Sequence, residues 1–169
     1  MKIFKCRICK NPYLGKESPS NCAYCGVFSK YLKETGRINE EHPYLDNETG
    51  NYMLRIYEDK LKNRIFYKEA KKHMINGSLK SLLEIFQRVE ETHIKIFEGM
   101  GFNKSLPEKR PHVYKFEEDN LTEIFTRKKN SIEFQKKILK RIYDPYLVEL
   151  LDALSGAEES HLEILEKYM

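Results

Sequence analysis

Residues 79–97 read LKSLLEIFQRVEETHIKIF, and this stretch decides how the second part of the chain is organised. Its apolar residues recur at the three- and four-residue spacings of an amphipathic helix. Glu90 and His93 are three positions apart, so on a helix they lie on one face, about one turn from each other. Both side chains can therefore point into a helical core, where a carboxylate and an imidazole could share a metal ion.

The same Glu-x-x-His pattern returns as Glu158 and His161, 68 residues further along the chain (90 to 158). The same shift superposes residues of similar type elsewhere: Ile56 on Ile124, Tyr57 on Phe125, Lys60 on Lys128, Phe66 on Phe134, Leu82 on Leu150, Leu83 on Leu151 and Ile96 on Ile164. An internal repeat of this kind indicates two copies of one helical hairpin.

Turn and capping residues divide residues 52–169 into four predicted helices. Asn76-Gly77 should end the first, and Ser78 is the expected N-cap of the second. The segment 102–115 contains two prolines and is long enough to cross the length of a helical bundle. Asp144-Pro145 should cap and open the fourth helix. Two hairpins joined by one crossover predict a mainly α fold, a ferritin-like four-helix bundle.

A separate N-terminal segment, residues 1–35, carries four cysteines in two close pairs: Cys6 with Cys9, and Cys22 with Cys25. Two such pairs on facing turns can present four thiolates in a tetrahedron, and sulfur ligands select iron or zinc. The spacing does not decide between these metals. Free thiols or two disulfides are the alternatives, but a segment this short is not held together by core burial alone.

The linker, the charge pattern and the hydropathy of the chain indicate the surroundings in which these two regions work. Residues 36–51 are polar and contain Gly and Pro, so we interpret them as a linker. Basic and acidic residues are interleaved and the net charge is only +4, which is typical of solvated helix faces and does not favour nucleic-acid binding. No apolar run is long enough to span a membrane, and the first residues lack an apolar signal core. We therefore expect a cytoplasmic protein, whose reducing environment suits metal-binding cysteines.

The four cysteines, with Gly15, Pro19 and Gly26 at their positions between and after them, resemble the short rubredoxin-like, zinc-ribbon type of domain found in rubrerythrins. Placed ahead of a ferritin-like bundle, this domain makes the whole chain similar to rubrerythrins of the reversed domain order. The resemblance implies peroxide reduction at a di-iron centre in the bundle, with electrons fed through the four-cysteine iron. It also implies a redox partner protein and a homodimer, in which the rubredoxin-like domain of one subunit approaches the bundle of the other.

The resemblance also implies a set of di-iron ligands. Each of two helices in such a site gives a Glu-x-x-His pair, and each of the other two gives one Glu. Glu90 with His93 and Glu158 with His161 match the pairs. The family's single glutamates fall on two lysines of this chain, Lys60 and Lys128. Lys10 and Ala23 also stand where the family usually has Gly and Pro.

Charge favours a metal-free cluster at these positions. Two ammoniums beside two carboxylates sum to zero, as do two ferrous ions beside four carboxylates. An ammonium about 4 Å from a dication costs roughly 8 kcal/mol at an effective dielectric constant near 20. We predict one buried polar cluster around Lys60 and a repeat-related twin around Lys128, with Lys60 paired to either glutamate. A working di-iron centre, and a neutral lysine acting as a ligand or base, are the alternatives.

The sequence thus predicts a rubrerythrin-like metal-binding protein of redox ancestry, with electron transfer and peroxide reduction as its candidate activities and a di-iron site degenerate at two lysines. No catalytic residue is assigned. The alternative is a non-enzymatic, zinc-stabilised helical bundle for assembly or partner binding. Nucleic-acid binding through a zinc ribbon is a weaker third class.

Overall fold

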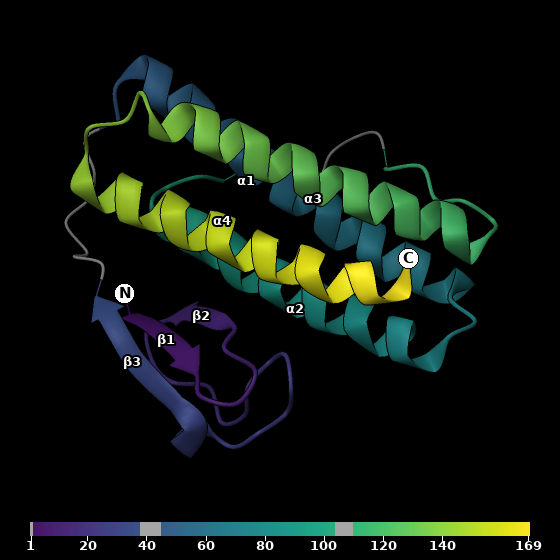
Figure 1. Cartoon of the computed structure of the whole chain (residues 1–169). Coiled ribbons are helices and arrows are strands. Elements are labelled where there is room, and N and C mark those ends of the chain that lie inside the picture. Colours follow the sequence, from purple (N-terminus) through teal and green to yellow (C-terminus); the bar gives the residue numbers. More distant parts are fainter. Residues whose placement is uncertain (1, 38–44, 104–109) are drawn as a thin grey trace.

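The computed structural model describes residues 2–37, 45–103 and 110–169, and within them it is mainly helical (Figure 1). Four α-helices account for most of the described chain: α1 (Asn47–Ala70), α2 (Gly77–Gly99), α3 (Glu117–Leu139) and α4 (Pro145–Leu165). Three strands form a small antiparallel sheet: β1 (Lys2–Cys6), β2 (Pro12–Gly15) and β3 (Leu32–Arg37). Short 3-10 turns cover Ser29–Tyr31, Lys71–His73 and Glu166–Tyr168.

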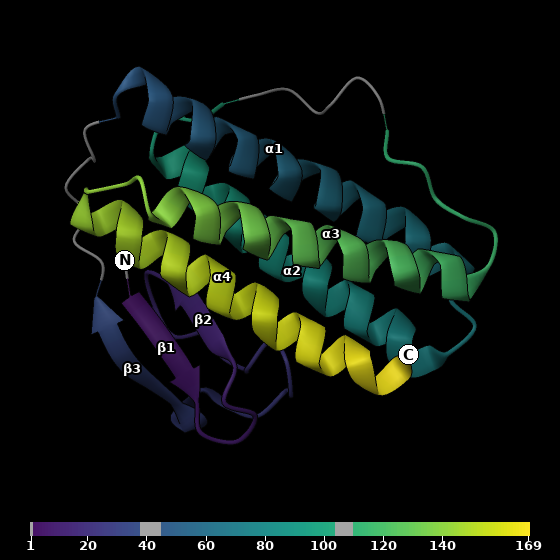
Figure 2. The same cartoon turned by 45° about the horizontal axis from the view of Figure 1, so that its top comes forward.

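The four helices lie side by side, with the sheet against one side of them (Figures 1 and 2). Helices adjacent in sequence pair as the repeat predicts, α1 with α2 and α3 with α4, and α1 also packs on α3. The turns within both pairs are short, so each pair is an antiparallel hairpin. We call α1–α4 the helical unit and residues 2–37 the cysteine domain.

Helix α1 begins at Asn47, earlier than the expected start near residue 52. The cause is Asp46, whose side chain accepts a hydrogen bond from the backbone N–H of Thr49 at 2.7 Å and so caps the helix. Residues 47–51 of the expected linker are therefore helical, and β3 extends into the linker as far as Arg37. Residues 38–44 of that linker, like 104–109 of the expected crossover, lie outside the described residues.

The expected N-cap of α2 at Ser78 is wrong. Asn76 caps this helix, because its side-chain oxygen accepts from the backbone N–H groups of Ser78 and Leu79. Asn and Ser are about equally good caps, and the helix starts two residues earlier than expected because Asn76 comes first in the chain. The expected start of α4 is confirmed: Asp144 accepts from the N–H of Leu147, and the proline follows directly at the first helical position.

The core of the helical unit is divided into two apolar halves. One half contains the first part of α1 with the ends of α2 and α3 and the start of α4, including Met53, Phe97, Ile138 and Leu150. The other contains the second part of α1 with the starts of α2 and α3 and the end of α4, including Phe66, Leu83, Ile124 and Leu165. Buried polar residues occupy the middle of every helix, between these halves.

The cysteine domain is built on the strand order β2-β1-β3. In the β1–β2 pair, Ile3 lies opposite Leu14 and Phe4 opposite Tyr13. Phe4 and Leu14 are buried, and β2 contacts both α2 and α4. The domain therefore rests on the helical unit of its own chain.

The residue that directly follows each cysteine pair has a left-handed backbone: Lys10 with φ 65° and Gly26 with φ 73°. Within the described residues, Lys10 is the one non-glycine residue with positive φ. A side chain in this conformation costs roughly 1–2 kcal/mol, because Cβ approaches the following carbonyl oxygen. The missing glycine noted in the sequence therefore strains the first cysteine turn.

Substituting Lys10→Gly should stabilise the zinc-loaded protein by about 1 kcal/mol, since glycine adopts positive φ without this strain. Chemical denaturation followed by backbone signals of the cysteine domain measures the change. The matched control is Lys33→Gly, an exposed lysine in β3 with ordinary backbone geometry, which should destabilise. Equal losses in both variants would show that the turn is not strained.

No helix among the described residues has the length and apolar character needed to cross a membrane.

Candidate functional site

The four cysteines converge at one corner of the cysteine domain. Their sulfur atoms all lie within 4.8 Å of one another, and none forms a disulfide. Cys6 Sγ and Cys25 Sγ are 3.8 Å apart, and Cys9 Sγ and Cys22 Sγ are 3.6 Å apart. A metal with four sulfur ligands at about 2.3 Å has tetrahedral edges of about 3.8 Å. The donor set and its spacing therefore fit one tetrahedral ion.

Backbone N–H groups of the two cysteine turns point at the sulfurs. Burial opposes ionisation of Cys6, but N–H groups of Cys9 and Ile8 donate to its sulfur and bring its pKa down to about 7. Burial raises the pKa of Cys22, although N–H groups of Cys25 and Tyr24 donate to that sulfur in the same way. Such donors stabilise thiolates, which are the form that binds metal. They do not distinguish iron from zinc.

The second candidate site lies in the middle of the helical unit. Each helix places one or two residues there: Lys60 from α1, Glu90 and His93 from α2, Lys128 from α3, and Glu158 and His161 from α4. His93 is 3% exposed and the other five are fully buried. The structure thus brings together all six residues that the sequence singled out, and we call them the ion-pair network.

Glu158 is the centre of this network. Its Oε1 accepts a hydrogen bond from Lys60 Nζ, and its Oε2 accepts one from Lys128 Nζ at 2.6 Å. Glu90 is held more loosely, with its Oε2 3.3 Å from Lys60 Nζ and its Oε1 3.9 Å from Lys128 Nζ. Neither oxygen of Glu90 has a hydrogen-bond partner among the described residues.

The structure therefore joins the two predicted clusters into one. Both lysines reach the same glutamate, from α1 and α3, because the four helices place these side chains at the same level of the core. The predicted pairing of Lys60 with a glutamate across the core is resolved in favour of Glu158, with Glu90 as the second partner. The result is one network with two positive and two negative side chains.

The histidines add no charge to this network. Lys128 Nζ donates to His161 Nδ1 at 2.9 Å, since an ammonium has hydrogens only to donate. Burial and the charge of Lys128 lower the pKa of His161 to about 4. Burial also lowers the pKa of His93. Both imidazoles are therefore neutral at pH 7.

Mutual pairing keeps the two glutamates and Lys60 charged. Burial would raise the pKa of Glu158, but Lys128 and Lys60 outweigh it and hold that pKa well below the usual range. The pKa of Glu90 is lowered in the same sense, chiefly by Lys60 against the effect of burial. For Lys60, burial would lower the pKa, but Glu158 and Glu90 raise it. Buried charges of this kind are tolerated when they are paired and hydrogen-bonded.

By residue type and spacing, Glu90, His93 and Glu158 could hold an ion, because they offer ligand atoms within 4.8 Å of one another. The two lysines argue against a di-metal centre, since their ammoniums contact the same carboxylate oxygens that would bind the metals. Both oxygens of Glu158 already accept hydrogen bonds from lysine. The residues present do not fit a di-iron site.

Two aromatic residues lie beside the network, and the sequence indicated only core packing for them. Phe86 stacks near His161 with ring centroids 4.3 Å apart, and Lys128 Nζ lies 4.6 Å from the Phe86 ring centroid. Lys128 Nζ is also 5.2 Å from the ring centroid of Tyr67, whose hydroxyl is buried without a partner in the described chain. Phe86 precedes Glu90 by four residues and Tyr67 follows Lys60 by seven, so helical spacing could have identified both.

Tyr24 connects the two candidate sites. It lies between Cys22 and Cys25 in sequence, and its ring centroid is 5.5 Å from that of His161. Burial and the negative charges of Glu158 and Cys22 raise the pKa of Tyr24, so its hydroxyl stays neutral. No local sequence signal could have found this contact, because it depends on how the cysteine domain rests on the helices.

The low pKa of His161 predicts an acid-sensitive fold. Its pKa is about 4 in the folded state and about 6.5 when unfolded, so the unfolded chain binds more protons as pH falls through that window. The free energy of unfolding should fall by about 3 kcal/mol between pH 6.5 and 4 from this residue.

The matched variant is His161→Gln, which can still accept from Lys128 but does not titrate. Its free energy of unfolding should depend less on pH than that of the unmodified protein between pH 6.5 and 4. Protonation of the cysteines and glutamates affects both proteins alike. Parallel curves for the two proteins over this window would rule out a neutral, buried His161.

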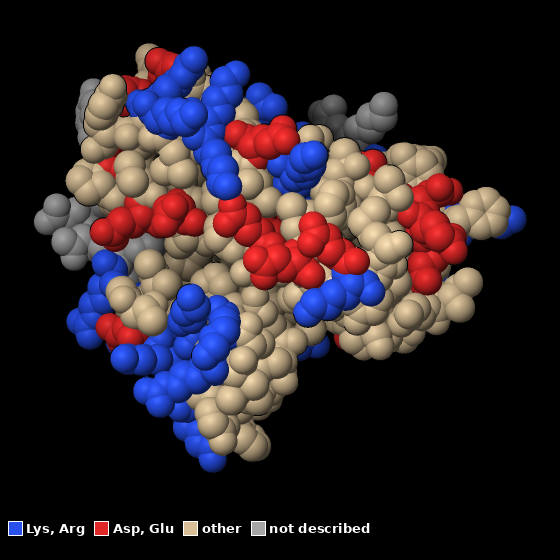
Figure 3. All heavy atoms as spheres, viewed as in Figure 1, with Lys and Arg blue, Asp and Glu red and all other residues tan. Residues whose placement is uncertain are grey.

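Surface charge is less evenly spread than the sequence suggested. Between residues 2 and 37 there are eight Lys or Arg and two Glu. Basic side chains gather over the strands at the lower left of Figure 3, whereas acidic side chains form a band across the helical unit on the same face. A second group of basic side chains lies at the top of this face, over the helices, so the cysteine domain is one of two basic parts of it.

Comparison with known proteins adds no relative: no family model, curated protein or solved structure matches this chain.

Proposed function

We propose that this chain is a redox-type metal-binding protein whose four cysteines hold a single ion, while the ion-pair network takes the place of a di-iron centre in a ferritin-like four-helix bundle. The observation that carries the proposal is the contrast between the two sites. Four sulfur atoms with tetrahedral spacing are ready to bind a metal. In the bundle, two lysine ammoniums lie on the carboxylates instead.

Iron held by the four cysteines would supply a one-electron couple. The chain's own contribution is to hold the sulfurs and tune them through backbone N–H donors from the two cysteine turns. Cys25 is exposed, and Ile8 and Phe28 place exposed apolar side chains next to the cysteines in sequence. This corner of the domain is where a redox partner would approach.

The charge of the cysteine domain favours an acidic redox partner protein. Opposite charges increase association rates through long-range attraction, and this effect decreases with ionic strength. Peroxide reduction is not part of the proposal, because the residues of the ion-pair network do not fit the di-iron centre that such chemistry requires. The homodimer implied by the family resemblance remains a prediction.

Protein produced with ample iron should be coloured, since ferric thiolate sites absorb visible light. A chemical reductant should bleach it with about one electron per chain, and an oxidant should restore the colour. A colourless zinc form from the same iron-rich preparation would contradict electron transfer. It would favour the alternative, a zinc-stabilised helical bundle that serves assembly or partner binding, because zinc has no redox chemistry.

A further inference from the structure

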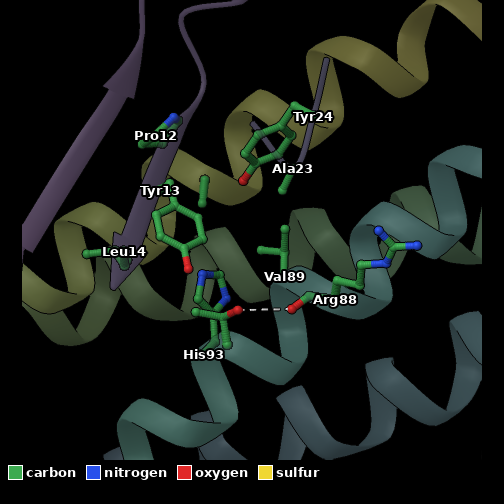
Figure 4. Close-up of a pocket in the computed structure, with 10 residues that line it drawn as sticks. Pro12, Tyr13, Leu14, Ala23, Tyr24, Arg88, Val89 and His93 are labelled. Atoms are coloured by element: carbon green, nitrogen blue, oxygen red, sulfur yellow. Dashed lines mark hydrogen bonds between the residues drawn. The ribbon is translucent and has the colours of Figure 1, made fainter. Parts of the chain in front are cut away.

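A cavity of about 120 Å³ lies where the cysteine domain meets the helical unit. Its walls come from both parts of the chain: Tyr13 on β2, Tyr24 in the second cysteine turn, Val89 and His93 on α2, and Ala157 on α4 (Figure 4). Most of this lining is apolar or aromatic. Arg88 also lines the cavity, but it is exposed, and Figure 4 shows its guanidinium pointing away from the rings of His93, Tyr13 and Tyr24.

His93 is the one member of the ion-pair network that lines this cavity. Its side chain is 97% buried, against complete burial of the other five residues. Figure 4 shows its ring on the helix side of the cavity, with the rings of Tyr13 and Tyr24 on the side of the cysteine domain. A ligand in the cavity would therefore contact the ion-pair network through His93 alone.

The surroundings of the His93 ring decide which of its two nitrogens carries the hydrogen and which can accept a hydrogen bond. Nδ1 faces Glu90 Oε2 at 3.7 Å, which is too far for a hydrogen bond, and it has no hydrogen-bond partner in the described chain. The negative charge of this carboxylate favours the tautomer of the neutral imidazole that carries its single hydrogen on Nδ1. Nε2 then carries a lone pair, and because His93 lines the cavity, a ligand there is the partner that we assign to it.

We propose that this cavity binds a small, uncharged, mostly aromatic or aliphatic alcohol, whose hydroxyl donates a hydrogen bond to His93 Nε2. The size follows from the volume, since a cavity of roughly 150 Å³ lined by apolar side chains accommodates benzene. The absence of charge follows from the lining, because Arg88 is its one charged residue and is exposed, and because the network behind His93 is neutral overall. A buried, unpaired charge in such a site would be strongly unfavourable.

The site is independent of the proposed electron transfer, so it can be tested in the zinc-loaded full chain. Phenol is the probe, followed by backbone amide chemical shifts on titration. Saturable shifts should appear at Thr92, His93, Ala157 and Tyr24. Toluene, which has the same ring without the hydroxyl, should bind at least tenfold more weakly. Equal affinity for the two probes would overturn the hydrogen bond to His93.

Filling the cavity tests its position. Ala157→Leu should weaken phenol binding at least tenfold, since the larger side chain occupies the space. Gly156→Ala is the matched control on the same helix, because a Cβ at Gly156 meets no atom within 4 Å and residue 156 does not line the cavity. Unchanged affinity in Ala157→Leu would overturn the proposal.

Thr92→Leu fills the cavity from α2 instead, and it should also weaken phenol binding at least tenfold if Ala157→Leu does not fold. Benzoate tests the claim about charge. It should bind at least tenfold more weakly than phenol, and tighter binding of benzoate would mean that Arg88 recruits anions and that the ligand class is wrong.

Discussion

Replacing Lys60 with Met should lower the free energy of unfolding by about 3 to 5 kcal/mol, the usual cost of breaking a buried ion pair by removing one partner. Lys60 Nζ contacts both Glu158 and Glu90 and is completely buried. Its loss leaves two carboxylates with Lys128 as their only nearby ammonium in the network. Chemical denaturation of the zinc-loaded protein measures the difference.

The control for this substitution is Lys68→Met, an exposed lysine on the same helix. It should change the free energy of unfolding by no more than about 0.5 kcal/mol. A change near zero for Lys60→Met would show that the network is not a set of paired charges.

A second substitution should repair much of the loss. Without Lys60, the one lysine contact that Glu90 keeps within the network is the longer one to Lys128 at 3.9 Å. Lys60→Met combined with Glu90→Gln restores neutrality and leaves the Lys128–Glu158 pair intact. The double variant should be more stable than additive losses predict, by about 1 kcal/mol or more. Simple additivity would mean that charge balance does not hold the network together.

Replacing Cys22 and Cys25 together with Ser should remove the metal and unfold the cysteine domain. In small domains built on structural metals, about 10–16 kcal/mol of metal binding serves as folding free energy. Few apolar residues of this domain are buried, chiefly Phe4 and Leu14, so little else holds it. Amide hydrogen exchange should show lost protection in residues 2–37 and retained protection along α1 and α3.

Ser18→Ala, an exposed change in the same loop region, is the control for the cysteine variant and should keep both metal and protection. Full protection of residues 2–37 in the metal-free cysteine variant would contradict a metal-held domain. Loss of protection throughout the helical unit would show that the helices depend on the cysteine domain.

The sequence predicted those features that depend on local spacing. The cysteine pairs indicated a four-thiolate site, and the structure brings their sulfurs within 4.8 Å of one another. The 68-residue repeat (90 to 158) aligned Lys60 with Lys128 and Glu90 with Glu158, and all four are fully buried. Helical periodicity is sufficient for this, since it fixes which side of a helix faces the core.

Features that depend on the relative placement of helices could not be predicted in the same way. A repeat suggests two equivalent clusters. In the structure, however, α1 and α3 place Lys60 and Lys128 at the same height along the helical unit, so both lysines contact Glu158. Neighbouring positions also break the symmetry, because Phe86, which packs on His161, aligns with Leu154 under the same shift. One glutamate therefore becomes the centre of the network and the other remains loosely held.

The contact between Tyr24 and His161, and the cavity beside it, required the tertiary structure. Both depend on the packing of β2 and the second cysteine turn against α2 and α4. From sequence alone, Tyr24 could be assigned only to the small core of its own domain.

The central claim is that the metal belongs to the cysteines and not to the helices. Elemental analysis of iron and zinc, on protein produced with ample iron, tests it most directly. We predict about one metal ion per chain, lost when Cys22 and Cys25 are replaced with Ser. About three ions per chain, with two surviving those substitutions, would contradict the account and show a working di-metal site in spite of Lys60 and Lys128.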